Sequence, residues 1–283
     1  MKAPVRPRLA RVFFTIVLIL FGVGLAVSAC VHQTKTAGQA GEQASAPPAP
    51  TATVPTPGTP SRATPPSRKP PAPFPRAVAT PRLPAPYLPL WPFANGRQVR
   101  DWEAGYRSGG HQPWHLSAQQ TALAFTRGYL GYTEVNRVAA TTISGRHARV
   151  AVGSLTDAGR VGTAGVIHLV RFGSGSTAPW EVVGTEDLTL SLTTPAYGAR
   201  ITTGKVVVGG RITGVDESIR VQARQLSSTG VIGEFCCVSA GDQNQPWSAT
   251  VTIRGGPGVI TIAAYTGGHL KIVERFAVTG VVR

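Results

Sequence analysis

Trp247-Ser248-Ala249-Thr250-Val251-Thr252-Ile253, residues 247–253, is the stretch that decides the fold of this chain. Apolar and hydroxyl side chains alternate strictly along it, which is typical of a β-strand with one buried face. Similar short runs lie on both sides, separated by turns at Gly209-Gly210, Gly255-Gly256 and Gly267-Gly268. Six or seven such runs without a helix pattern predict an all-β sandwich over residues 193–283, of the immunoglobulin-like kind.

A different pattern occupies residues 87–192. Ser117 followed by Gln120 is a capping box that opens a helix. The helix has one apolar stripe, formed by Ala118, Ala122, Phe125 and Tyr129. After it the apolar period changes to two, in residues 147–152, 166–172 and 180–192. A helix followed by three or four strands predicts a small α+β domain, with the helix on an antiparallel sheet.

Residues 1–30 have the pattern of a secretory signal peptide. Four basic residues precede an uncharged apolar run over residues 12–27, and the run ends in Val27-Ser28-Ala29-Cys30. These four residues resemble the bacterial lipobox, which implies that a diacylglycerol is attached to Cys30 and that the mature protein starts there. An uncleaved membrane-spanning helix over residues 12–31 is the alternative, because about 20 apolar residues cross a bilayer. Both predict a membrane-anchored protein on the extracytoplasmic face.

Residues 31–86 are predicted to be a disordered, Pro-rich linker. Fifteen prolines fall between Pro47 and Pro86, and large apolar side chains are rare. Such a chain favours extended polyproline II structure. Nine of the fifteen net positive charges lie in residues 1–86, so no basic stripe marks the folded part. Nucleic acid is therefore excluded as a partner.

Residues 194–283 resemble the immunoglobulin-like domain of bacterial spore germination proteins. The likeness lies in residues 194–199, 206–214, 217–221 and 246–251. It implies a role in the cell envelope, with a link to sporulation. The order of elements in the α+β domain resembles the nuclear-transport-factor-2-like superfamily. The 23 arginines against 5 lysines indicate a GC-rich bacterial genome, such as that of an actinobacterium, and the chain thus resembles an actinobacterial lipoprotein.

The sequence predicts no enzyme, and no catalytic, cofactor-binding or metal-binding residue. Phosphate-loop, zinc-protease and serine-hydrolase motifs are absent from it. His111 and His115 lie four apart but precede the helix, which favours surface or packing roles. His168 is the candidate pocket residue, because it shares a strand face with Val166 and Val170 that would line the cavity of a cone-shaped domain. Packing in the core is the alternative for His168.

Two further features leave alternatives open. Cys236 and Cys237 are expected to be one buried and one exposed thiol, because neighbours on a strand face opposite sides. A disulfide between them, or to another chain, is the alternative in an oxidising exterior. Tryptophans that follow a proline are expected to anchor elements in the core, with stacking on wall sugars as the alternative: Trp114, Trp180 and Trp247.

These patterns together predict a lipid-anchored, non-catalytic binding or structural protein of the bacterial cell envelope. Its expected partner is a wall polymer or another envelope protein, met by the immunoglobulin-like module. The alternative is a small-ligand-binding protein or an enzyme that uses a cavity in residues 87–192, with His168 as the polar group.

Overall fold

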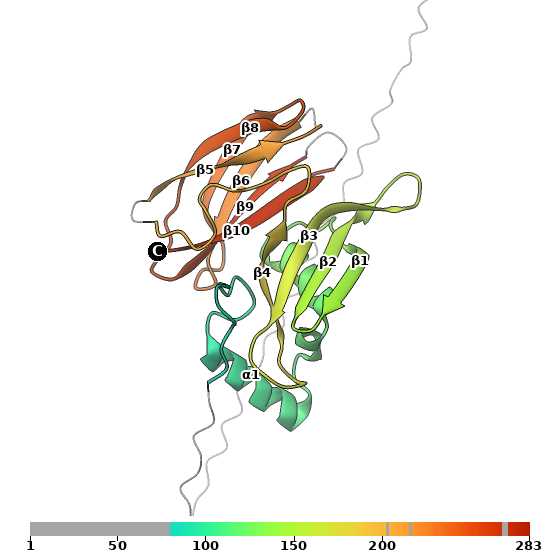
Figure 1. Cartoon of the computed structure of the whole chain (residues 1–283), viewed down its shortest axis with the longest axis vertical. Coiled ribbons are helices and arrows are strands. Elements are labelled where there is room, and N and C mark those ends of the chain that lie inside the picture. Colours follow the sequence, from blue (N-terminus) through green and yellow to red (C-terminus); the bar gives the residue numbers. More distant parts are fainter. Residues whose placement is uncertain (1–79, 202–203, 215–216, 268–270) are drawn as a thin grey trace, which may run out of the picture. The chain divides into compact units, whose positions relative to one another are not determined.

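The computed structural model describes residues 80–201, 204–214, 217–267 and 271–283. The predicted anchor with Cys30 and nearly all of the predicted linker lie outside these residues. The described part is mostly antiparallel β-sheet, with a few short helices ahead of the strands (Figure 1). Among its helices, none is both long enough and apolar enough to span a bilayer.

The first helix, α1 (Gly96–Gly109), is bounded by cap residues at both ends. The side chain of Asn95 accepts hydrogen bonds from the backbone N–H groups of Arg97 and Gln98 at 3.0 and 3.2 Å. The helix ends at Gly110, whose φ of 68° is the left-handed conformation that glycine adopts most easily. Helix α1 was not predicted from the sequence, although Val99, Trp102 and Tyr106 lie at i, i+3 and i+7 and pack in one cluster with Phe93 and Phe172.

The helix predicted after Ser117 is confirmed. A 3-10 turn, Pro113–Leu116, leads into α2, Ala118–Ala124, and the Ser117 hydroxyl accepts a hydrogen bond from the Gln120 N–H at 3.3 Å. The helix continues as a π-helical turn, Phe125–Tyr129. The first three positions of the predicted apolar stripe are buried and the fourth is half-buried.

Four antiparallel strands follow α2 in chain order and form one sheet: β1 (Arg137–Ser144), β2 (His147–Leu155), β3 (Val161–Arg171) and β4 (Trp180–Glu186). Ala122 and Phe125 pack on one face of this sheet in a common core with Val150 and Ile167. The predicted strand over residues 180–192 is too long, because β4 ends at Glu186. The leucines that follow it contact a different core, described next.

The remaining strands form two further sheets, with the orders β10-β9-β6-β7 and β5-β8. Their bounds are β5 (Lys205–Ile212), β6 (Glu217–Arg224), β7 (Val231–Ala240), β8 (Gln245–Thr252), β9 (Val259–Thr266) and β10 (Arg275–Val282). The alternation predicted for residues 247–253 is confirmed, since Trp247, Ala249 and Val251 are buried and the residues between them are exposed. Leu190 and Leu192 belong to this second core.

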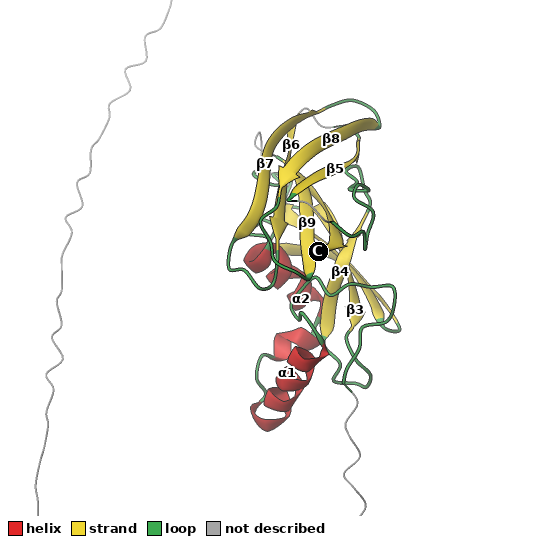
Figure 2. Ribbon diagram, turned by 90° about the vertical axis from the view of Figure 1, so that its left-hand side faces the viewer, coloured by secondary structure: helices red, strands yellow, loops and turns green. Residues whose placement is uncertain are grey.

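One hydrophobic core crosses the boundary predicted between residues 192 and 193. Ala263 and Phe276, from β9 and β10, belong to the core under the first sheet, whereas their neighbours Ala264 and Ala277 belong to the second core. β9 and β10 therefore bury both faces. The contact is close: a Cβ atom on Gly165 of β3 would lie 2.6 Å from the Phe276 ring. All described residues belong to one compact unit. Figure 2 shows α1 at its lower end and β5, β6, β7 and β8 at its upper end.

The expectation for Cys236 and Cys237 is wrong in its first form. Both side chains are exposed, and a disulfide joins them. They lie on β7, which ends its sheet and pairs there only with β6. Because the pairing of β6 and β7 shifts register between Ile219 and Arg220, opposite Val238 and Cys236, Cys237 has no residue directly opposite it. The regular alternation of faces assumed for this strand is interrupted at the cysteines.

Candidate functional site

His168 lies near the middle of β3, on the face of the first sheet that points away from α2. Its neighbours Ile167 and Leu169 point into the helix-covered core and are fully buried. His168 itself is half-buried. It is therefore not a core histidine, and the helix-covered side of the sheet is filled with apolar side chains rather than hollowed around it.

His168 forms a cluster with His147 and Tyr87. Nδ1 of His147 lies 3.1 Å from Nε2 of His168, within hydrogen-bond distance. The Tyr87 ring meets both imidazoles edge-on, with centroid distances of 5.6 Å to His147 and 5.3 Å to His168. The sequence did not single out His147 or Tyr87. Neither is near His168 in the chain, and they meet only through strand register and through the path of the segment that precedes α1.

A cavity of about 420 Å³ opens beside His168, between the first sheet and the residues that lead into the second half. Its lining includes Tyr87, His168, Asp187, Tyr197 and Thr279. The Tyr197 hydroxyl accepts a hydrogen bond from the Leu88 N–H at 2.6 Å. The cavity thus combines aromatic walls with a few polar groups, a mixture common in small-molecule sites.

Burial lowers the pKa of His168 below its ordinary value of 6.5. Arg149 and His147 also lower it, and Glu186 acts in the opposite direction. His168 is therefore a neutral imidazole at pH 7, able to accept a hydrogen bond or bind a metal through its free nitrogen. Burial raises the pKa of Tyr197 to about 12, so this hydroxyl stays protonated.

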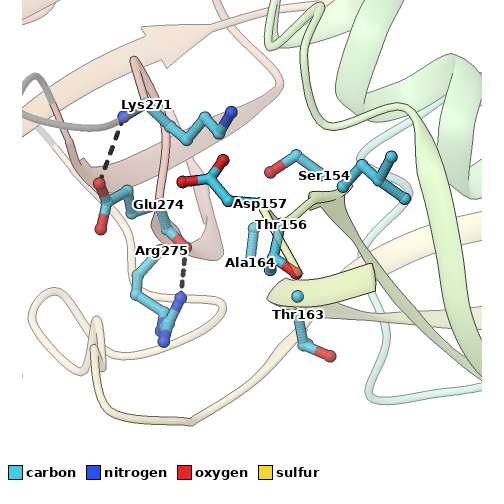
Figure 3. Close-up of a pocket in the computed structure, with 10 residues that line it drawn as sticks. Ser154, Thr156, Asp157, Thr163, Ala164, Lys271, Glu274 and Arg275 are labelled. Atoms are coloured by element: carbon cyan, nitrogen blue, oxygen red, sulfur yellow. Dashed lines mark hydrogen bonds between the residues drawn. The ribbon is translucent and has the colours of Figure 1, made fainter. Parts of the chain in front are cut away.

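A second hollow of about 210 Å³ lies between the β2–β3 turn and the segment before β10 (Figure 3). Four charged residues line it: Asp157, Lys271, Glu274 and Arg275. The Glu274 side chain accepts a hydrogen bond from the Lys271 N–H at 3.3 Å, and its backbone carbonyl accepts one from Arg275 at 2.8 Å. These bonds give the Glu274 carboxylate and the Arg275 guanidinium a structural role in the segment before β10.

Glu181 is a buried carboxyl group in β4, between Trp180 and Val182, and its burial was not predicted from the sequence. It is fully buried, and its Oε2 accepts a hydrogen bond from the Phe93 N–H at 3.2 Å. Its Oε1 has no hydrogen-bond partner among the described residues. Burial raises the pKa of Glu181 well above its ordinary value of 4.5, against the smaller opposite effect of the Phe93 hydrogen bond.

The other residues considered from the sequence pack within the fold. His115 is buried between aromatic rings and bonds Gln112 at 3.3 Å, while His111 is exposed. Trp180 and Trp247 are buried, in agreement with core anchoring, and Trp114 is half-buried and stacked on Trp91. In the described ranges, no group of three or more His, Cys, Asp or Glu residues is placed to hold a metal ion.

No protein-family model, no curated protein and no solved structure matches this chain. The likeness of residues 194–283 to the immunoglobulin-like domain of spore germination proteins, and that of residues 87–192 to the nuclear-transport-factor-2-like fold, therefore stay predictions. The function has to be argued from the chain itself.

Proposed function

We propose that this chain is a membrane-anchored, extracytoplasmic binding protein of the bacterial cell envelope, without catalytic activity. The observation that carries the proposal is the charged, then apolar, N-terminal segment ending in Val27-Ser28-Ala29-Cys30. It makes Cys30 the lipidated first residue of the mature protein, and residues 31–86 the extended linker that holds the folded part away from the membrane.

An immunoglobulin-like architecture for residues 193–283 is part of this proposal. Strands β5 and β8 pair in one sheet and β10, β9, β6 and β7 in another, all antiparallel. Two isolated β-bridges add to these sheets: Thr194 pairs with Gly209 in antiparallel orientation, and Arg200 pairs with Val282 in parallel orientation. Two such sheets enclosing a common core support a sandwich of this class. A helix on a four-stranded sheet likewise supports an α+β fold for residues 87–192.

The binding surface of this proposal is the edge of the sandwich at β7, which faces a wall polymer or another envelope protein. β7 is the last strand of its sheet, and a partner strand can add beside it beyond Ile232, whose carbonyl already accepts a hydrogen bond from the Arg254 N–H at 2.8 Å. Val231, Cys236 and Cys237 of β7 are exposed and add apolar contact area. The resemblance to spore germination proteins adds a link to sporulation to the proposal, to be examined through the phenotype of a deletion strain.

The test has two parts, because anchoring and binding are separate claims. Mass spectrometry of the mature N-terminus should find a lipid-modified Cys30, and Cys30→Ala should leave the leader uncleaved and the lipid absent. The full chain should also sediment with purified cell-wall sacculi or with a defined envelope protein. Recovery of the wild-type protein from the cytosol with residues 1–30 intact would contradict the proposal.

A small-ligand-binding role is the second candidate, and the cavity beside His168 favours it. The cavity has the size and the mixture of aromatic and polar groups that suit a small molecule. Binding of wall fragments can be followed by the shift of side-chain NMR signals, with Tyr197→Phe and His168→Gln as variants. Turnover of a fragment that is lost in His168→Gln would establish an enzyme instead of a binding protein.

A further inference from the structure

Two imidazole nitrogens face each other at the edge of the cavity. His147 opens β2 and pairs with Val170, while His168 pairs with Arg149, so the two histidines are diagonal neighbours on one face of adjacent strands. Their facing atoms, Nδ1 of His147 and Nε2 of His168, are 3.1 Å apart. At this distance one of these nitrogens donates a hydrogen bond to the other, and the tautomers of the two rings decide which one is the donor.

This separation also suits two ligands of one metal ion. A nitrogen–metal distance of about 2.0–2.1 Å places two neighbouring nitrogens about 2.9 Å apart in square-planar and about 3.3 Å apart in tetrahedral geometry. The observed 3.1 Å lies between these values. Neutral imidazole is the protein ligand that suits zinc and copper best after thiolate, so small ring rotations convert the hydrogen-bonded pair into a chelating pair.

The surroundings of the pair favour a bound cation. The Tyr87 ring lies edge-on to both imidazoles and limits their rotation. Two arginines lie near the pair along the chain. The Nε of Arg149 donates a hydrogen bond to Glu186 at 2.8 Å, which offsets its charge, and Arg146 is exposed and donates to the backbone carbonyl of Arg171 at 2.8 Å. His168 also lines the cavity of about 420 Å³, so solvent or a small ligand can reach a metal from that side.

We propose that His147 and His168 bind a divalent transition-metal ion, Cu²⁺ or Zn²⁺, at the edge of the cavity. His147 binds through Nδ1 and His168 through Nε2, and the remaining coordination positions are open to water or to a ligand in the cavity. The proton shared by the two rings moves to the other nitrogen of the imidazole that carries it, which frees both facing nitrogens for the metal. Sequence spacing does not predict this pair, because the two histidines are 21 residues apart and meet only through the register of β2 and β3.

The experiment uses the full chain in detergent micelles, freed of metal with a chelator and titrated with Cu²⁺. Electron paramagnetic resonance should report one tight site with two imidazole ligands. His147→Ala and His168→Ala should each weaken that site at least tenfold, since loss of a second-shell partner alone costs about 10–100-fold. His111→Ala is the matched control, because His111 is exposed and should leave the site unchanged.

A second measurement covers the case in which a variant does not fold. In wild-type protein, Cu²⁺ should broaden the NMR signals of β2 and β3 around His147 and His168 before all others. Equal copper binding in wild type and both histidine variants, or a loss in only one of them, would overturn the proposal. So would broadening that begins elsewhere in the chain. Competition by Zn²⁺ for the same site distinguishes which of the two ions is held more tightly.

Discussion

Phe276 joins the two halves of the folded part, and its removal offers the sharpest stability test. Its side chain is 2% exposed and belongs to the core under the first sheet, although β10 is a strand of the second half. Its ring centroid lies 5.5 Å from that of Tyr132. Replacing a buried Phe by Ala costs about 3–5 kcal/mol through lost burial and the cavity left behind. Because domains are stable by only about 5–15 kcal/mol, this is a large fraction of the total.

Urea unfolding followed by two probes measures this cost and its extent. Four of the five tryptophans lie in residues 87–192, so fluorescence mainly reports the first half, whereas circular dichroism reports all the strands. We expect both transitions of Phe276→Ala to move to lower urea together, because one core spans the two halves. Phe235→Ala is the matched control: Phe235 is half-buried against the second core alone and should cost less.

A double-mutant cycle checks the contact itself. Gly165→Ala places a methyl group 2.6 Å from the Phe276 ring and should destabilise by about 1–3 kcal/mol through overpacking. Phe276→Leu removes part of the ring, so the double variant should lose less stability than the two single variants added together. Additive effects, or a fluorescence transition of Phe276→Ala that stays at the wild-type midpoint, would refute the shared core.

Three further variants follow from single contacts. Glu181→Gln should flatten the pH dependence of stability. Because burial raises the pKa of Glu181, its carboxyl group stabilises the folded state below pH 4.5, and this contribution is lost as the pH rises through the folded pKa. The melting temperature of the variant should therefore increase relative to that of the wild type toward alkaline pH. Thr185→Val should cost about 1–3 kcal/mol in urea unfolding, because it removes the hydroxyl that accepts from the Val278 N–H at 2.8 Å; an unchanged midpoint would contradict this. Ser117→Ala should cost about 0.5–2 kcal/mol through loss of the α2 cap, with Ser117→Asp as the variant that retains stability.

Local sequence patterns were sufficient to predict an element where one of its faces is buried and the other is exposed to solvent. Ser117 and the apolar stripe after it predicted α2, and the alternation over residues 247–253 predicted β8 with the correct buried face. Helix α1 was missed because its apolar stripe has only three members, Val99, Trp102 and Tyr106, among charged residues and glycines. The strand expected over residues 180–192 was predicted too long. Its last leucines, Leu190 and Leu192, are buried in the second core and do not belong to β4.

The candidate site could be predicted only in part. His168 was singled out from its strand, but its face was expected to line a domain interior, and in the structure it is half-buried beside a cavity. Its partners Tyr87, His147 and Tyr197 are far from it in the chain, and no spacing rule connects them.

The sequence alone determined that the chain is rich in β-strands, that a helix begins after Ser117, and that its N-terminus has the pattern of an exported protein. Those properties depend on periods and end signals that neighbouring residues carry. Only the tertiary structure decided which strands share a core, which histidines face each other and where the cavity opens. Shared cores, facing side chains and cavities depend on strand register and on contacts between residues far apart in the chain. The alternation of apolar and polar residues along a strand is the same whichever strand it pairs with, so it does not identify the partner.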